Sequence, residues 1–91
     1  MENSHFASLL KKVPEGFRKV QYNGRAYSLA RTNFNNGKSA KVYARELGGS
    51  DWISFNSYNT QNGTQLKPCE MPREKVTHFL EHMEFMPEPP V

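Results

Sequence analysis

The sequence predicts an α+β domain: a five-stranded antiparallel β-meander with an N-terminal short helix and a C-terminal amphipathic helix packed on the sheet. Two observations predict this fold class. Turn-forming residue pairs recur about every 11–14 residues through the middle of the chain, and apolar residues repeat at helical spacing on either side. The 91 residues fit one domain, residues 1–86, and a proline-rich tail, residues 87–91, that we expect to be disordered.

The first element is a short helix near the N-terminus. Its apolar residues follow the spacing i, i+3, i+4 and i+7, which places them on one side of a helix: Phe6, Leu9, Leu10 and Val13. Pro14 ends the helix because proline cannot continue the backbone hydrogen bonding, and Glu15-Gly16 then turns the chain.

The next fifty residues alternate between strand-forming segments and tight turns. The turn pairs supply residues that accept a positive φ, as two-residue hairpin loops require: Asn23-Gly24, Asn36-Gly37, Gly48-Gly49 and Asn62-Gly63. The segments between them are rich in Tyr, Phe, Val, Thr and Trp, which favour strands. The predicted strands are residues 17–22, 25–34, 39–47, 51–59 and 64–70.

Two-residue turns also fix the register, and the register decides which side chains share a face. One face collects the apolar residues Val20, Tyr22, Tyr27, Leu29, Val42, Ala44, Ile53, Phe55 and Leu66. The other carries Lys19, Ala30, Lys41, Tyr43, Arg45, Trp52, Ser54, Asn56, Tyr58 and Lys67. Because separate turns agree on a single apolar face, the sheet prediction is internally consistent.

The last element is an amphipathic helix that begins near Pro72. Its apolar side holds Val76, Phe79, Leu80 and Met83, and we expect it to lie on the apolar face of the sheet. His78 and His82 project to the opposite side, above Glu74, and read as an ordinary solvated surface. No further ligand completes a metal site there, so we predict no metal and no cofactor.

Charge and composition narrow the function classes. Residues 17–67 hold eight basic and two acidic residues, a net charge of +6, whereas residues 68–91 carry −3. This asymmetry allows a polyanion partner without requiring one. The sequence has no apolar leader segment, no membrane-length apolar run and one cysteine, Cys69, so we expect a cytoplasmic protein without a membrane partner.

The polar face of the sheet is the first candidate site. Its candidate ligand-binding residues are Lys41, Tyr43, Arg45, Trp52, Tyr58 and Lys67. Aromatic rings between basic side chains suit single-stranded nucleic acid, because bases stack on rings while cations hold phosphates. In the alternative, the N-terminal helix covers Trp52 and Tyr43 as a second small core. We expect the covered arrangement, because so short a chain often needs both faces of its sheet buried.

Cys69 is the second candidate, as a reactive thiol in a redox protein. It sits between a predicted strand and a predicted helix, where a helix N-terminus and Lys67 would favour the thiolate. No second cysteine is present to resolve an intermediate, and a buried, unreactive cysteine is the expected alternative. Phosphate-binding loops, nucleophile elbows and paired cysteines are missing from the sequence, which gives no support to an enzyme.

The segment from Lys41 to Asn56, continued by residues 66–72 and by Lys75-Val76, resembles small bacterial proteins of unknown function. Some of those proteins carry a methionine sulfoxide reductase label. The resemblance covers about residues 20–80 and implies no residue roles. The chain lacks both the Gly-Cys-Phe-Trp segment and the zinc-spaced cysteines of such reductases. We therefore expect a small binding or regulatory module without catalysis, with single-stranded nucleic-acid binding and thiol redox chemistry as alternatives.

Overall fold

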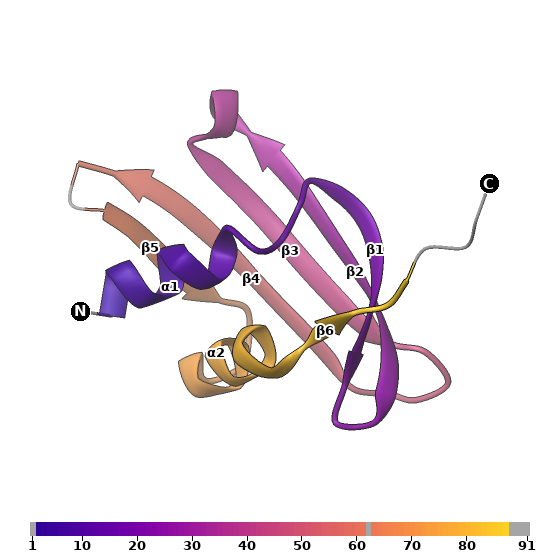
Figure 1. Cartoon of the computed structure of the whole chain (residues 1–91). Coiled ribbons are helices and arrows are strands. Elements are labelled where there is room, and N and C mark those ends of the chain that lie inside the picture. The colour runs from indigo at the N-terminus through magenta and orange to yellow at the C-terminus, as the bar shows by residue number, and fades with distance from the viewer. Residues whose placement is uncertain (1, 62, 88–91) are drawn as a thin grey trace.

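The computed structural model describes residues 2–61 and 63–87, with side chains from residue 5 onward. Its elements are α1 (Glu2–Leu10), β1 (Gly16–Tyr22), β2 (Arg25–Phe34), the 3-10 turn η1 (Asn35–Gly37), β3 (Ser39–Glu46), β4 (Trp52–Thr60), β5 (Gly63–Pro68), α2 (Arg73–His82) and β6 (Glu84–Phe85). The predicted α+β class with an antiparallel sheet is confirmed (Figure 1). The predicted tail lies outside the described residues except for Pro87. Among the described residues, no helix is long and apolar enough to cross a membrane.

The sheet has six strands in the order β5-β4-β3-β2-β1-β6, one more than predicted. The additional strand, β6, follows directly after α2 and pairs with β1 through Val20 opposite Phe85 and Gln21 opposite Glu84. A two-residue strand is too short to show an alternating pattern, so the sequence could not reveal it. Met83, predicted as the last apolar residue of the helix, is buried but already has extended backbone.

The predicted register is confirmed across the central strands. Leu29 lies opposite Ala44 and Val42 lies opposite Phe55, as predicted. The connection centred on residues 36–37 is not the predicted two-residue turn, however, but the four residues between paired Phe34 and Ser39. Asn23 and Gly24 have φ of 54° and 74°, the left-handed conformation that a two-residue hairpin of this kind needs. The hairpin turns therefore determine which side chains face the core.

The core lies between the sheet and the two helices. All nine residues of the predicted apolar face are buried, together with the apolar residues predicted for the two helices: Phe6, Leu9, Leu10, Val13, Val76, Phe79, Leu80 and Met83. The N-terminal helix ends at Leu10, earlier than predicted, so Val13 lies beyond α1 as Met83 lies beyond α2. The ring of Phe6 from α1 meets Phe55 edge-on, with ring centroids 5.7 Å apart. The ring of Phe79 from α2 makes similar contacts with Tyr22 and Tyr27 at 4.9 and 5.6 Å.

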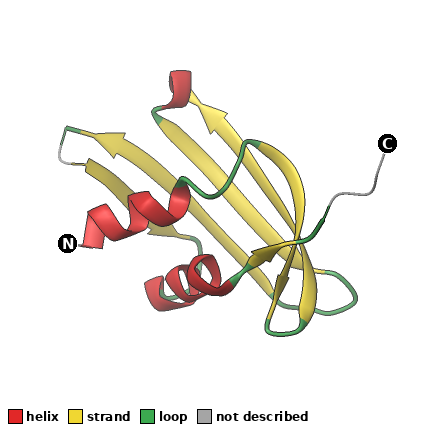
Figure 2. Ribbon diagram, viewed as in Figure 1, coloured by secondary structure: helices red, strands yellow, loops and turns green. Residues whose placement is uncertain are grey.

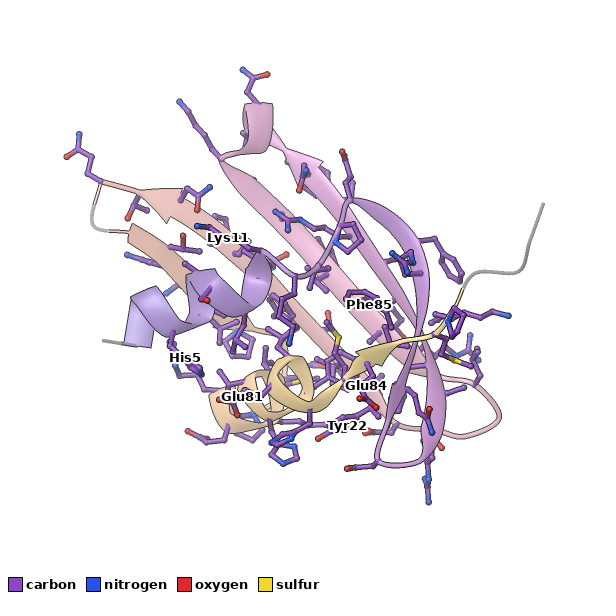
Figure 3. All side chains as sticks on the ribbon, in the orientation of Figure 1. His5, Lys11, Tyr22, Glu81, Glu84 and Phe85 are labelled. Atoms are coloured by element: carbon purple, nitrogen blue, oxygen red, sulfur yellow. The ribbon has the colours of Figure 1, made fainter. Side chains whose placement is uncertain are left out.

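Both helices pack on the same side of the sheet, as Figures 1 and 2 show. The expectation that the N-terminal helix covers Trp52 and Tyr43 is therefore wrong. Six strands span roughly 24 Å, whereas one helix is only about 10 Å across, so a single helix cannot cover the apolar face. His5 of α1 and Glu81 of α2 point toward each other in Figure 3, with 2.7 Å between Nε2 and Oε2, and so connect the two helices.

Candidate functional site

We call the side of the sheet that neither helix covers the open face; it carries the predicted residues Lys41, Tyr43, Arg45, Trp52, Tyr58 and Lys67. At its centre the rings of Tyr43 and Trp52 stack, with centroids 6.4 Å apart and planes inclined by 22°. Tyr43 lies opposite Ser54, and Trp52 lies opposite Arg45, so the two rings are diagonal neighbours on β3 and β4. Tyr43 is 41% exposed and Trp52 is half-buried, which leaves ring surface accessible.

Basic side chains surround this aromatic pair. Lys41 and Arg45 lie two residues on either side of Tyr43 along β3 and therefore share its face. Lys67 lies in the same row as Lys41, with Asn56 between them. The fourth cation of the open face, Lys19, comes from β1.

Carboxylates are excluded from most of this surface. The open-face positions of β1 to β5, all of them described, include no Asp or Glu. Glu84 shares this face, but it lies on β6 at the edge of the sheet, opposite Gln21. The open-face positions of β1 to β5 therefore carry a net positive charge, which suits an anionic ligand. Glu46 and Asp51 lie next to this surface, where they line a hollow beside Trp52.

Two further aromatic residues of the open face were missing from the sequence-based candidates. Phe17 on β1 is 63% exposed, and Phe34 at the end of β2 is 48% exposed. Phe34 lies opposite Ser39, which in turn lies opposite Tyr58, so Phe34 and Tyr58 flank a small residue in one row. The same strand alternation that found Tyr43 could have found both phenylalanines.

The turn that leads into Trp52 is fixed by buried Glu46. Its carboxylate accepts hydrogen bonds from Nη1 of Arg25 at 3.0 Å and from the backbone N–H of Asp51 at 3.2 Å. Gly49 passes directly over this carboxylate, since a Cβ at Gly49 would clash with Oε2 of Glu46. The Gly48-Gly49 turn is therefore shaped both by positive φ at Gly48 and by close approach at Gly49.

Asp51 connects the same turn to helix α2. Its carboxylate accepts hydrogen bonds from the Tyr27 hydroxyl at 2.7 Å and from the Lys75 ammonium at 2.8 Å. Burial alone would raise the pKa of Asp51, but the hydrogen bonds from Lys75 and Tyr27 outweigh it and hold that pKa below its usual range. Burial and the bond to Asp51 raise the pKa of Tyr27, so its hydroxyl remains a donor.

Cys69 lies on the open face and is half-buried, not enclosed in the core as expected. Its backbone N–H donates to the Ser54 carbonyl at 3.0 Å, which continues the row that contains Tyr43. The amide Nδ2 of Asn56 approaches Sγ at 3.9 Å. The proximity to a helix N-terminus is also weaker than expected, because α2 begins only at Arg73.

The two histidines of α2 are exposed, as predicted, but they are not free of contacts. The rings of His78 and His82 lie 4.3 Å apart between centroids, and Nδ1 of His78 shares a hydrogen bond with the Tyr22 hydroxyl. Among the described residues, no three His, Cys, Asp or Glu side chains gather as potential metal ligands.

Comparison with known proteins gave no match, whether against family models, curated proteins or solved structures. The resemblance to small bacterial proteins therefore stays an expectation. Function is inferred below from the geometry and chemistry of the open face.

Proposed function

We propose that this protein binds single-stranded nucleic acid on the open face of its sheet. One observation carries the proposal: both helices pack on the opposite side, which leaves the stacked Tyr43 and Trp52 rings accessible between basic side chains.

The chemistry of the open face fits a single strand better than a duplex. Unpaired bases expose flat faces that stack on Tyr43 and Trp52, whereas duplex bases are already stacked on each other. Lys41 and Arg45 lie on either side of the ring pair, where successive phosphates of a bound strand would pass. The absence of carboxylates from the open-face positions of β1 to β5 removes repulsion along that path.

A cytoplasmic location and a role as a small regulatory module remain predictions that agree with this proposal. Binding by stacking and by phosphate contacts tolerates many sequences, because every base has a flat face. Such a surface would suit a protein that occupies unpaired strands in general.

The test uses the fluorescence of Trp52, the only tryptophan. We expect a ten-nucleotide oligo(dT) to quench this emission, and the affinity to fall as salt rises because phosphate contacts release counterions. Trp52→Ala should weaken binding by about 1–3 kcal/mol, the cost of losing one stacked base. Because Trp52→Ala removes the reporter, its binding is measured by anisotropy of a labelled oligonucleotide.

Lys41→Gln tests the electrostatic contribution of phosphate contacts to oligonucleotide binding. Removing one phosphate contact should reduce the slope of log affinity against log salt by about 0.7. The matched control is Lys11→Gln, because Lys11 is an exposed lysine at the end of α1, on the helix-covered side (Figure 3). It should leave both affinity and slope unchanged.

Three results would contradict the proposal. One is an emission of Trp52 that oligonucleotides do not change at low salt. Another is a stable dimer in sedimentation with blue-shifted Trp52 emission, which would mean that a second copy covers the open face. Equal affinity for duplex and single strand would also contradict a stacking mode.

A further inference from the structure

A second feature of the open face lies at the far end of β4. There a hollow of about 520 Å³ is lined by Tyr58 and by residues of the β2–β3 connection, among them Asn35, Asn36, Lys38 and Ser39. Tyr58 is six residues beyond Trp52 on the same strand and the same face. The two rings are therefore about 20 Å apart along the sheet.

The backbone of the β2–β3 connection is held in an uncommon conformation. Asn35, Asn36 and Gly37 have φ of 54°, 57° and 85°, three successive residues in the left-handed region. Asparagine tolerates this region better than most residues, but it still costs free energy at each position. Surrounding contacts must therefore hold the connection in place.

Backbone hydrogen bonds supply part of these contacts, from the Lys38 N–H to the Asn35 carbonyl at 3.1 Å and from the Asn59 N–H to the Lys38 carbonyl at 2.7 Å. Two amide side chains supply the rest. Nδ2 of Asn35 donates to the Ser39 hydroxyl at 3.2 Å, and Nδ2 of Asn59 donates to the Gly37 carbonyl at 3.2 Å. Oδ1 of Asn59 accepts from the Thr64 hydroxyl at 2.9 Å, so both the nitrogen and the oxygen of the Asn59 amide are hydrogen-bonded. The side chains of Asn35 and Asn59 thus help to hold the connection by hydrogen bonds.

Asn36 differs from both. It is exposed at the tip of the connection, and within the described residues its amide has no hydrogen-bond partner. Asn36 therefore lines the same hollow as exposed Lys38 and as Tyr58, which is 41% exposed, with an amide that the hydrogen bonds of the connection do not engage. No carboxylate lines this hollow, in contrast to the hollow beside Trp52, which Glu46 and Asp51 line.

We infer that this hollow is a base-recognition subsite for one nucleotide of the strand bound on the open face, an inference that rests on the proposed function. The base stacks on Tyr58, the amide of Asn36 bonds the edge of the base, and Lys38 faces its phosphate. A carboxamide matches adenine best, because its oxygen accepts from N6 while its nitrogen donates to N7. The subsite therefore adds a preference for adenine at one position to otherwise sequence-tolerant binding.

The experiment scans a single adenine through an oligo(dT) ten-mer. Trp52 quenching reports binding, and the adenine is placed at each position in turn, because the direction of the strand is not fixed in advance. About 20 Å corresponds to roughly six nucleotides at stacked spacing. We expect one position, three to six nucleotides from the base on Trp52, at which adenine tightens binding roughly fivefold.

Asn36→Gly is the decisive variant. Glycine keeps the left-handed backbone and removes only the amide, so the connection should retain its shape. The adenine preference should disappear, while binding of plain oligo(dT) stays unchanged. The control Gln21→Ala removes an exposed amide elsewhere on the open face and should preserve the preference.

The outcomes separate this inference from the proposed function. If plain oligo(dT) quenches Trp52 but the adenine scan is flat, the subsite is wrong and the stacking surface stands. A preference that survives in Asn36→Gly also rules out the assigned recognition. If no oligonucleotide quenches Trp52, the proposed function itself fails, and the subsite fails with it.

Discussion

Asp51 links the turn before Trp52 to helix α2 through Tyr27 and Lys75. Because its folded-state pKa lies below the ordinary value of about 3.9, the ionised form stabilises the fold above about pH 4. That contribution is lost as the pH falls through the lowered pKa. The carboxylate is 35% exposed, so solvent screening keeps the contribution small, about 1 kcal/mol.

The effect of Asp51→Asn can be predicted because the ionised form of Asp51 stabilises the fold. At pH 7 the variant should have a lower free energy of unfolding than the wild type, by about 1 kcal/mol in urea titrations. The difference should shrink below pH 4 as the wild-type carboxylate is protonated. A difference for Asp51→Asn that stays constant with pH would contradict the assigned role.

Cys69 offers a second prediction, because its thiol is half-buried in the row of Tyr43 on the open face. A strand that stacks on Tyr43 and Trp52 should shield this thiol, so oligo(dT) should slow its modification by a thiol reagent at constant ionic strength. The protection should be lost in Trp52→Ala under conditions where that variant no longer binds. Equal modification rates with and without oligonucleotide would place the bound strand elsewhere.

Strand alternation predicted the side chains of the open face, but it could not predict the state of each one. Tyr43, Trp52 and Tyr58 lie on the face that their register requires. Whether the amide of Asn36 is free depends instead on which neighbouring asparagines form the hydrogen bonds that hold the β2–β3 connection. The alternation of side chains along a strand does not indicate this. Sequence therefore specified the stacking surface and not the hollow beside it.

At the scale of elements, the sequence predicted both helices and missed their shared location. An apolar stripe shows that a helix is buried on one side, but not against which surface. The width of the sheet supplies the missing constraint, since the two helices are both needed to cover one apolar face. Glu84–Phe85 adds a sixth strand only because α2 ends beside β1, which is a consequence of tertiary packing.

The packing of α2 leads to a third prediction. Phe79 is fully buried against Tyr22 and Tyr27, so Phe79→Ala should lower the free energy of unfolding by about 3–5 kcal/mol in denaturant titrations. His82→Ala, on the exposed side of the same helix, should change it by less than about 0.5 kcal/mol. Similar effects from both variants would mean that α2 is not anchored through Phe79.

For the whole molecule, charge is divided between the two sides of the sheet. Residues 17–67 carry eight basic residues, but on the described strands only Lys19, Lys41, Arg45 and Lys67 project from the open face, with Lys38 at its end in the β2–β3 connection. Others are engaged on the helix-covered side, as Arg25 is with Glu46 and Arg31 is with the Leu10 and Val13 carbonyls. The net charge of a segment thus overstates the charge that a ligand on one face would meet.

The same division separates stability from binding, and neighbouring residues of β4 can test it. Trp52 projects from the open face and Ile53 from the core face, where it is 1% exposed. Ile53→Val should cost about 0.5–1.5 kcal/mol of unfolding free energy and leave oligonucleotide affinity unchanged.

Trp52→Ala should instead affect binding more than stability. It removes a half-buried ring stacked on Tyr43 and should cost about 1 kcal/mol of stability. It should weaken binding by about 1–3 kcal/mol. Urea titrations and anisotropy of a labelled oligonucleotide measure the two quantities on the same samples. If Ile53→Val weakened binding as much as Trp52→Ala, loss of affinity would reflect general loosening of the fold. A loss confined to Trp52→Ala would mean instead that the strand stacks on the side of the sheet that folding leaves uncovered.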